Sequence, residues 1–209
     1  GSLIDSEIVT ITVNNVNQAP VLAAIGAQSV NENTLLTFGV SATDPDGTTP
    51  SFTTSTLPTG ATFTDNGNGT GTFNWTPTFA QSGSYPVTFY ASDGTLIDSE
   101  LVTITVNNVN QAPVLAAIGA QSVNENSLLT FGVSASDPDG TTPSFTTSAL
   151  PTGATFTDNG NGTGTFNWTP TFAQSGSYPV TFRASDGSLV DSEQVTITVN
   201  NVNQAPVLA

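Results

Sequence analysis

The sequence of 209 residues contains no lysine, histidine, cysteine or methionine, and Arg183 is its single cationic side chain. The 16 acidic residues give the chain a formal net charge of −15. Because nucleic-acid binding depends on clustered Lys and Arg, this charge excludes nucleic acid as a partner. Anionic membrane surfaces are disfavoured for the same reason, and no apolar run approaches the roughly 18 residues of a membrane span. We therefore expect no membrane insertion by this segment.

The missing side chains also remove most catalytic chemistry. Without Cys there is no disulfide, thiolate metal site or thiol nucleophile, and without His or Lys a serine nucleophile has no base. A carboxylate pair for glycoside hydrolysis needs a cleft and one raised pKa, and nothing in the sequence builds a cleft. We predict that the chain is not an enzyme.

The chain repeats itself at a constant offset. Pro20 recurs as Pro113 (113 − 20 = 93) and Trp75 as Trp168 (168 − 75 = 93). Solenoid units run at roughly 20 to 50 residues, whereas a β-sandwich domain takes about 100. We therefore expect each copy to fold independently. The predicted organisation is the C-terminal strand of a preceding repeat (1–16), two full repeats (17–109 and 110–202) and the start of a following one (203–209).

Each copy shows the two-residue period of β-strands and no helical period. Alternation is clear over 35–42, 85–92 and 101–106, where every second residue is apolar. Shorter runs at 28–30, 51–54, 61–64 and 71–75 are separated by Gly- and Asn-rich turns such as "DNGNGTG". The sequence predicts an all-β Greek-key sandwich of about seven strands per repeat.

The alternation also predicts which side chains form the core. The predicted core residues of the first repeat are Phe38, Phe63, Phe73, Trp75, Tyr85, Val87, Phe89, Val102, Ile104 and Val106. Trp75 and Trp168 fit a core better than a ligand platform. The two drastic differences between the copies, Tyr90 against Arg183 and Leu101 against Gln194, fall at outward positions, where an unpaired charge is tolerated.

Each repeat carries seven acidic residues, and their placement follows the strand ends. In the first repeat "DPDG" (Asp44, Asp46) follows the second strand, and "SDG" (Asp93) follows the sixth. In a Greek-key sandwich these ends share one pole with the incoming linker "NNVNQAP". Oxygen ligands from three loops suit a hard cation such as Ca²⁺, and the absence of His and Cys argues against zinc or copper. "DPDG" is also a good type I turn sequence, but its pairing with "ASDG" and an Asn-rich linker in every copy favours the metal site. We expect Asp65 to form a hairpin turn, and Asp98 and Glu100 to solvate an edge, although Asp98 could also reach the same pole.

The motifs "ENTLL", "ATDPDG", "ASDG" and "VTITVNNVNQAP" resemble the calcium-binding elements of cadherin repeats. The stretch from "LPTGATF" to "YASDG" resembles the bacterial Ig-like, dystroglycan-type cadherin-like repeats of large surface proteins. The resemblance covers the whole chain and implies tandem sandwiches arranged end to end. In the cadherin case it also implies Ca²⁺ at each junction.

The resemblance implies specific ligands. At the second junction they are Glu32 at the base of the first repeat, Asn108 and Asn110 in the linker, and Asp137, Asp139 and Asp186 at the top of the second. At the first junction they are Asn15, Asn17, Asp44, Asp46 and Asp93. The cadherin linker usually carries Asp where this chain has Asn108 and Gln111. With fewer anionic ligands we expect one ion per junction and an affinity of about 10⁻⁴ to 10⁻³ M.

The function we predict is that of a spacer or stalk in a large extracellular or cell-surface protein, whose partners are the neighbouring repeats. Near-identical modules give length and stiffness without a unique site. Two alternatives stay open. One is an array that associates laterally into fibres or between cells, and the other is an accessory module of a secreted polysaccharide-active enzyme.

Overall fold

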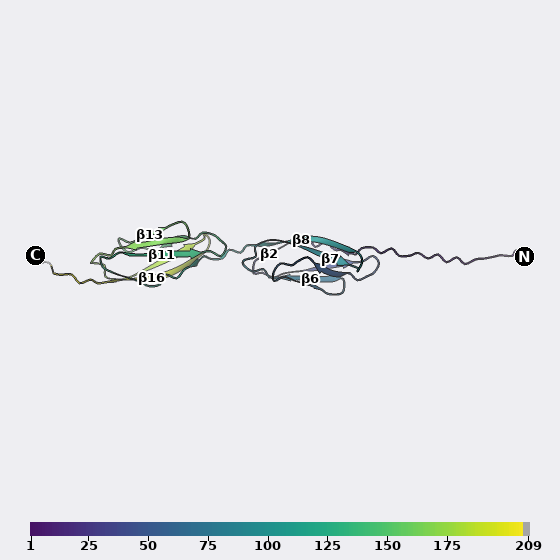
Figure 1. Ribbon diagram of the computed structural model, residues 1–209, viewed down its shortest axis with the longest axis horizontal. Coiled ribbons are helices and arrows are strands. Elements are labelled where there is room, and N and C mark those ends of the chain that lie inside the picture. Colours follow the sequence, from purple (N-terminus) through teal and green to yellow (C-terminus); the bar gives the residue numbers. More distant parts are fainter. Residues whose placement is uncertain (207–209) are drawn as a thin grey trace. The chain divides into compact units, whose positions relative to one another are not determined.

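The computed structural model describes residues 1–206, all in strands or irregular segments (Figure 1). The chain divides into two compact units, 1–109 and 110–209. No helix of the described residues is long and apolar enough to cross a membrane. The boundary between the units falls between Val109 and Asn110.

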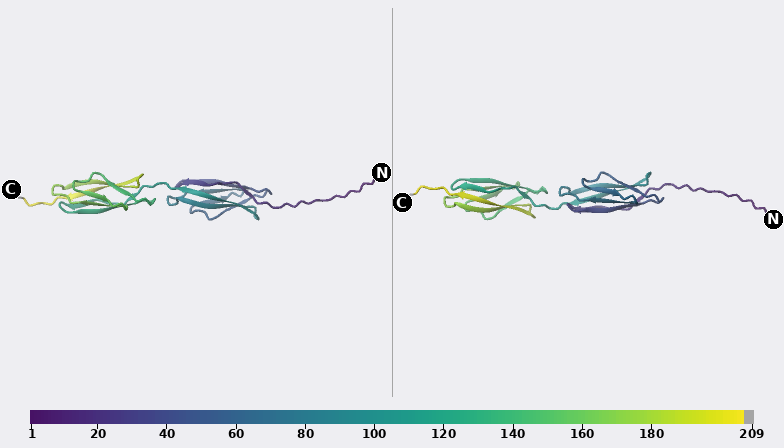
Figure 2. Two further views of the ribbon diagram at one scale, coloured as in Figure 1. Left: turned by 90° about the horizontal axis from the view of Figure 1, so that it is seen from above. Right: turned by 90° about the horizontal axis from the view of Figure 1, so that it is seen from below.

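The first unit is a sandwich of two four-stranded sheets (Figures 1 and 2). One sheet has the order β1-β3-β6-β5 and the other the order β2-β8-β7-β4. All pairings are antiparallel except that of β2 with β8, which is parallel. The strands are β1 (Val21–Leu22), β2 (Gln28–Asn31), β3 (Leu36–Thr43), β4 (Ser51–Thr54), β5 (Thr62–Asp65), β6 (Thr70–Trp75), β7 (Gly83–Ser92) and β8 (Ile97–Asn107).

The second unit repeats this topology, with the sheets β9-β11-β14-β13 and β10-β16-β15-β12. Its register is the same after the offset: Phe131 faces Phe166 as Phe38 faces Phe73. The strands are β9 (Val114–Leu115), β10 (Gln121–Asn124), β11 (Leu129–Ser136), β12 (Ser144–Thr147), β13 (Thr155–Asp158), β14 (Thr163–Trp168), β15 (Gly176–Ser185) and β16 (Val190–Asn200).

The core lies between the two sheets, where the apolar members of each alternating strand meet. Phe73, Val87, Phe89, Val102 and Ile104 are fully buried, as predicted. Trp75 is 1 % exposed, and its indole N–H donates to the carbonyl of Thr59, which satisfies its polar atom. The interpretation of the tryptophans as core residues is therefore confirmed.

Three predicted core aromatics, Phe38, Phe63 and Tyr85, are only partly buried, although each packs against the core. Phe63 lies over Gly71 on the neighbouring strand: a Cβ at Gly71 would come within 2.3 Å of the Phe63 ring. The ring thus uses space that only a glycine leaves open.

Each sandwich has two poles, fixed by the strand directions. The hairpin β7–β8 and the loops after β3 and β5 lie at the pole that the linker enters, which we call the entry pole. The opposite pole, where β2 and β8 both end, we call the exit pole. This division places the candidate site residues.

One strand of each unit was not predicted from the sequence, and one predicted strand does not form. β1 has two residues, too few for a period to show, so each unit has eight strands rather than seven. Residues 1–18 form no strand and are exposed. Their counterparts in β8 pair with β7 and β2, and residues 1–16 have no such neighbours in this chain. That they end a preceding repeat stays a prediction.

The alternation of inward and outward side chains along β7 allows a direct test of the core. Phe89 is 0 % exposed, whereas Tyr90, one residue on, points to the other side and is half-buried. Replacing Phe89 with Ala should lower the free energy of unfolding by about 3 to 5 kcal/mol, because it leaves a cavity between the sheets. Tyr90→Arg, which copies Arg183, should change it by less than about 0.5 kcal/mol. Denaturant titration measures both, and similar losses at the two positions would contradict the facing described here.

Candidate functional site

The loop after β3 forms a tight turn that brings two carboxylates to the entry pole. Gly47 N–H donates to the Asp44 carbonyl at 3.1 Å, and Gly47 has a φ of 82°. Within the turn, Asp46 N–H donates to Oδ1 of Asp44 at 2.7 Å. The interpretation of "DPDG" as a turn is therefore confirmed, and it holds both carboxylates beside the incoming linker.

The linker contacts the carboxylates of Asp46 and Asp93 through hydrogen-bond donors. Asn15 donates its side-chain N–H to Oδ1 of Asp46 at 2.9 Å, and Gln18 donates its backbone N–H to Oδ2 of the same residue at 2.6 Å. Asn17 donates its side-chain N–H to Oδ2 of Asp93 at 2.7 Å. All five predicted residues of the first junction therefore come together at one pole, and the amide nitrogens face the carboxylates.

Asp93 is also held by its own hairpin. Its Oδ1 accepts the backbone N–H groups of Thr95 and Leu96 at 2.6 and 2.7 Å. These two N–H groups, and then the Asn17 amide, hold the pKa of Asp93 below its ordinary value. At Asp46 the N–H of Gln18, followed by the amide of Asn15, lowers the pKa in the same way, although the nearby charge of Asp93 opposes it. Both carboxylates are therefore stabilised in the charged form.

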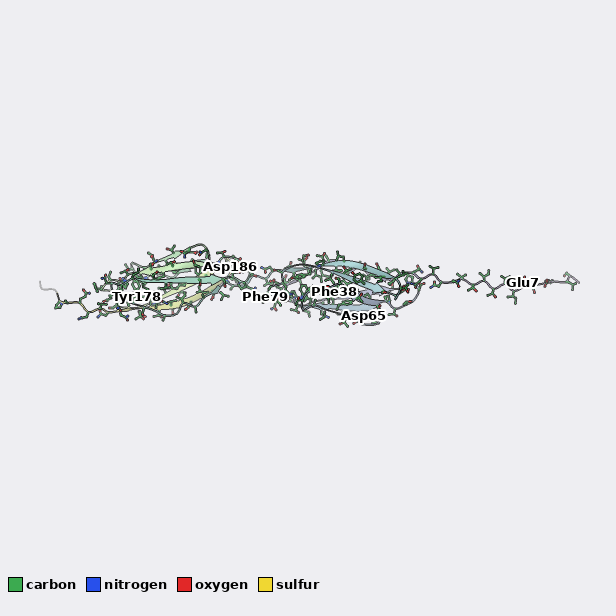
Figure 3. All side chains as sticks on the ribbon, in the orientation of Figure 1. Glu7, Phe38, Asp65, Phe79, Tyr178 and Asp186 are labelled. Atoms are coloured by element: carbon green, nitrogen blue, oxygen red, sulfur yellow. The ribbon has the colours of Figure 1, made fainter. Side chains whose placement is uncertain are left out.

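The second unit reproduces this entry pole. Asn110 donates its side-chain N–H to Oδ2 of Asp186 at 2.8 Å, and Gln111 N–H donates to Oδ2 of Asp139 at 2.6 Å. Asp139 N–H in turn donates to Oδ1 of Asp137 at 2.8 Å. Asp186 accepts two hairpin N–H groups, from Ser188 and Leu189, which hold its pKa below the ordinary value. Figure 3 shows Asp186 at one end of the second unit and Tyr178 near the other.

Glu32 and Asn108 lie in the first unit, at its exit pole. Glu32 directly follows β2 and is 2 % exposed, and its Oε2 accepts the N–H of Val109 at 2.9 Å. The next residue, Asn33, has a φ of 54°, which turns the chain away from the strand. Glu125 makes the equivalent bond to Val202 N–H at 2.8 Å and was absent from the predicted site. Each repeat therefore ties its outgoing linker to a buried glutamate.

Two carboxylates expected to solvate an edge have a structural role instead. Asp98 Oδ2 accepts the N–H of Leu22 at 2.8 Å. Glu100 accepts the N–H groups of Ile25 and Gly26, one on each oxygen, both at 2.8 Å. They hold the segment that crosses from β1 to β2. These bonds could not be predicted from the sequence, because the donors and acceptors are 74 to 76 residues apart. Asp98 and Glu100 also alternate with their neighbours as acidic residues at a solvent-exposed strand end would.

The entry poles can be tested for their fit to a cation. One oxygen of Asp44, Oδ2, is buried without a hydrogen-bond partner, and Oδ2 of Asp137 is in the same state. Such oxygens fit a metal ligand, since burying a carboxylate oxygen without a partner is costly. The oxygens of Asp46 and Asp93 instead accept N–H groups, and no three acidic side chains within residues 1–206 form a group that could hold a metal ion. The poles thus supply one orphaned oxygen each rather than a complete ligand shell.

A hollow of about 260 Å³ opens beside Asp44. Its lining is Ala42, Thr43, Asp44, Gly47, Thr48, Thr49, Pro50, Asn68 and Gly69. Asp44 is the single carboxylate among these residues, so the hollow lacks the acid–base pair that glycoside hydrolysis requires.

Comparison with known proteins agrees with the sandwich topology. The family model described as bacterial Ig domain matches residues 17–105 and again residues 110–199. Among solved structures, human protocadherin-24 EC1-2 superimposes with a TM-score of 0.56 at 18% identity, covering 88% of this chain and 100% of that one. This likeness concerns the fold.

Curated relatives match shorter parts of the chain. Chitinase A of Pseudoalteromonas piscicida is 30% identical over 131 residues, which are 62% of this chain and 16% of that protein. Integrin beta-like protein C of Dictyostelium discoideum is 32% identical over 146 residues, or 62% of this chain and 7% of that protein. The chain therefore spans a small part of the length of these relatives.

The lowered pKa values predict acid sensitivity. A carboxyl whose pKa is lower in the folded than in the unfolded state adds stability above the unfolded pKa, near 4, and this stability is lost as pH falls through the folded value. The free energy of unfolding should therefore decline below about pH 4. Replacing Asp93 and Asp186 with Asn should flatten this decline, because both shifts are removed.

Thermal unfolding monitored between pH 2 and pH 7 measures this effect. Asp5→Asn, in the exposed segment 1–18, is the matched control and should leave the profile unchanged. An acid profile that is identical in the Asp93/Asp186 variant and the control would show that the two hairpin carboxylates do not contribute.

Proposed function

The chain belongs to the bacterial Ig domain family, and we propose that it serves as a structural spacer in a large secreted or cell-surface protein. The observation that carries this proposal is the near-identity of the two repeats, which differ at seven positions over 17–109 and 110–202. A ligand-specific or catalytic module would need a unique site, whereas a spacer needs only a repeated fold. The absence of His, Lys and Cys supports a non-catalytic role.

The bonds at the poles support a spacer of limited flexibility. Within the first unit the incoming linker is fixed through Asn15, Asn17 and Gln18, and the outgoing linker through the N–H of Val109. Each repeat thus orders the chain on both sides of itself. Ordering a linker reduces the conformations that it samples and so limits bending between repeats.

The spacer proposal predicts an extended particle in solution. Small-angle scattering should give a distance distribution with a long tail, and a compact particle with the two sandwiches side by side would overturn the proposal. Asn110→Ala removes the bond to Asp186 and should increase the motion between repeats, measured by NMR relaxation as more independent tumbling. Asn159→Ala, which removes a bond within the β13–β14 hairpin, serves as the control.

We further propose that Ca²⁺ binds at the entry poles with an affinity of about 10⁻⁴ to 10⁻³ M. The support is the buried, unpartnered Oδ2 of Asp44 and of Asp137, next to the carboxylates of Asp46 and Asp139. The side chains of Asn15 and Asn17 would offer their oxygens in place of their nitrogens after a half-turn of the amide. A bound cation would neutralise part of the −15 charge and stabilise the folded state by mass action.

Calorimetric titration tests the calcium proposal. The chain should take up Ca²⁺ below about 5 mM, and its melting temperature should rise with the ion. Replacing both Asp44 and Asp137 with Asn keeps Oδ1 as the acceptor for the turn N–H and removes the orphaned anionic oxygen. This variant should fold normally and lose the calcium response. No uptake by the unaltered chain up to that concentration would overturn the calcium proposal and leave the spacer proposal standing.

A second candidate is an accessory module of a secreted polysaccharide-active enzyme. The observation that favours it is the similarity to part of Chitinase A. In that case the chain should be retained on insoluble chitin or a related polysaccharide. A chain that passes such a matrix without delay would argue against a binding module and for a spacer, and the sequence adjoining the chain in its parent protein would separate the two directly.

A further inference from the structure

The differences between the two repeats are not spread evenly over the fold. Four of the seven fall on β7, on β8 or in the turn between them, and the linkers and poles are otherwise nearly unchanged. The differing pairs are Thr34/Ser127, Thr43/Ser136, Thr56/Ala149, Tyr90/Arg183, Thr95/Ser188, Ile97/Val190 and Leu101/Gln194.

Three of these positions form one patch on the side of the β2-β8-β7-β4 sheet that faces away from the core, which we call the outer face. Tyr90 pairs with Ser99, so Ile97 and Leu101 are its two diagonal neighbours on β8. Diagonal neighbours lie about 7 to 8 Å apart, within reach of an aromatic side chain. Ile97 is 62 % exposed and Leu101 is 64 % exposed. The first repeat therefore presents a tyrosine flanked by two exposed aliphatic side chains.

The second repeat presents a polar version of the same patch. Arg183, exposed, pairs across the strands with Ser192 and Thr146, and its diagonal neighbours are Val190 and Gln194. All four neighbours are uncharged. The single cation of a chain with 16 acidic residues thus lies among uncharged neighbours rather than beside a carboxylate of its own sheet.

The outer faces carry no acidic residue at any outward strand position. In the first repeat these positions are Ser29, Asn31, Ser51, Thr53, Ser84, Pro86, Thr88, Tyr90, Ser92, Ile97, Ser99, Leu101, Thr103, Thr105 and Asn107. The carboxylates Asp98 and Glu100 of β8 point to the opposite side, where they bind the β1–β2 segment. Two outer faces can therefore approach without bringing carboxylates together, although the chains as wholes repel each other.

We propose that the outer face of the first repeat binds the outer face of the second repeat of another copy of the chain, with Arg183 of one copy stacked on Tyr90 of the other. The guanidinium of arginine is attracted to the face of a tyrosine ring when it lies within about 6 Å of the ring centre. Ile97 and Leu101 would cover the aliphatic stem of the arginine. Each contact uses one repeat from each chain.

The complementarity of Arg183 and Tyr90 favours pairing of a first repeat with a second repeat over pairing of two identical repeats. Pairing of two second repeats would place Arg183 against Arg183. Pairing of two first repeats would leave Arg183 of both chains without an aromatic partner. A single such contact is small and weak, but the contacts repeated along two arrays would add by avidity. This inference goes beyond the spacer proposal, because it concerns lateral association and does not depend on the order of the repeats in the parent protein.

Residue exchange tests the proposal, because each repeat already shows that the fold accepts the residue of the other. Sedimentation equilibrium of the unaltered chain should show a weak dimer. Tyr90→Arg gives a chain with two arginine patches, and Arg183→Tyr gives a chain with two tyrosine patches. The self-association constant of each variant should be lower than that of the unaltered chain by a factor of about ten or more. An equimolar mixture of the two should recover the association, and so should the double variant that carries both changes.

Thr34→Ser, a natural difference outside the patch, is the matched control and should associate as the unaltered chain does. Salt separates this contact from the pairing of Arg183 with a carboxylate of another chain. Raising NaCl from about 0.02 to 0.5 M screens the repulsion between chains and should preserve or strengthen dimers held by the patch. Dimers that dissociate at high salt and are unaffected by Tyr90→Arg would overturn the proposal. So would a chain that stays monomeric at millimolar concentration, or a polysaccharide that binds the first repeat through Tyr90.

Discussion

The fold depends on one interaction that occurs at every acidic residue of a repeat: a carboxylate accepts backbone N–H groups that no strand can satisfy. In the first repeat this holds for Glu32, Asp44, Asp46, Asp65, Asp93, Asp98 and Glu100. The same seven positions do so in the second repeat. Since backbone N–H groups without partners are costly, these side chains allow turns, crossings and linkers to be ordered in a chain that has no cysteine.

This interaction explains how a chain with almost no cations tolerates its charge. Each of these carboxylates faces the positive ends of N–H dipoles. The repulsion that a charge of −15 implies is thereby offset locally, at the places where the backbone most needs acceptors. At Asp46, Asp93 and Asp186 the same arrangement lowers the pKa, so protonation of these carboxylates in acid removes part of the stability.

The strands could be predicted from the sequence because their inward and outward residues alternate without interruption. Phe89 and Tyr90 were assigned to opposite sides by this period alone, and the structure confirms it. The structure places the first-junction residues at one pole, since the ends of β3 and β7 meet there. The bonds of Asp98 and Glu100 could not be predicted, because they join a strand end to an irregular segment about 75 residues away. Likewise, no pattern indicates that Asn15 and Asn17 present nitrogen rather than oxygen to the carboxylates.

The parallel pairing of β2 with β8 has a mechanical consequence. Gln28 pairs with Ile104 and Asn31 with Asn107, so the strand near the start of the repeat runs beside the strand at its end in the same direction. Tension applied to the two ends of a repeat would pull these strands along each other in opposite senses. Their hydrogen bonds would then be loaded together in shear, instead of breaking one after another. The hydrogen bond that the Val109 N–H donates to Glu32 lies at the end of this strand pair, where the load enters the sheet.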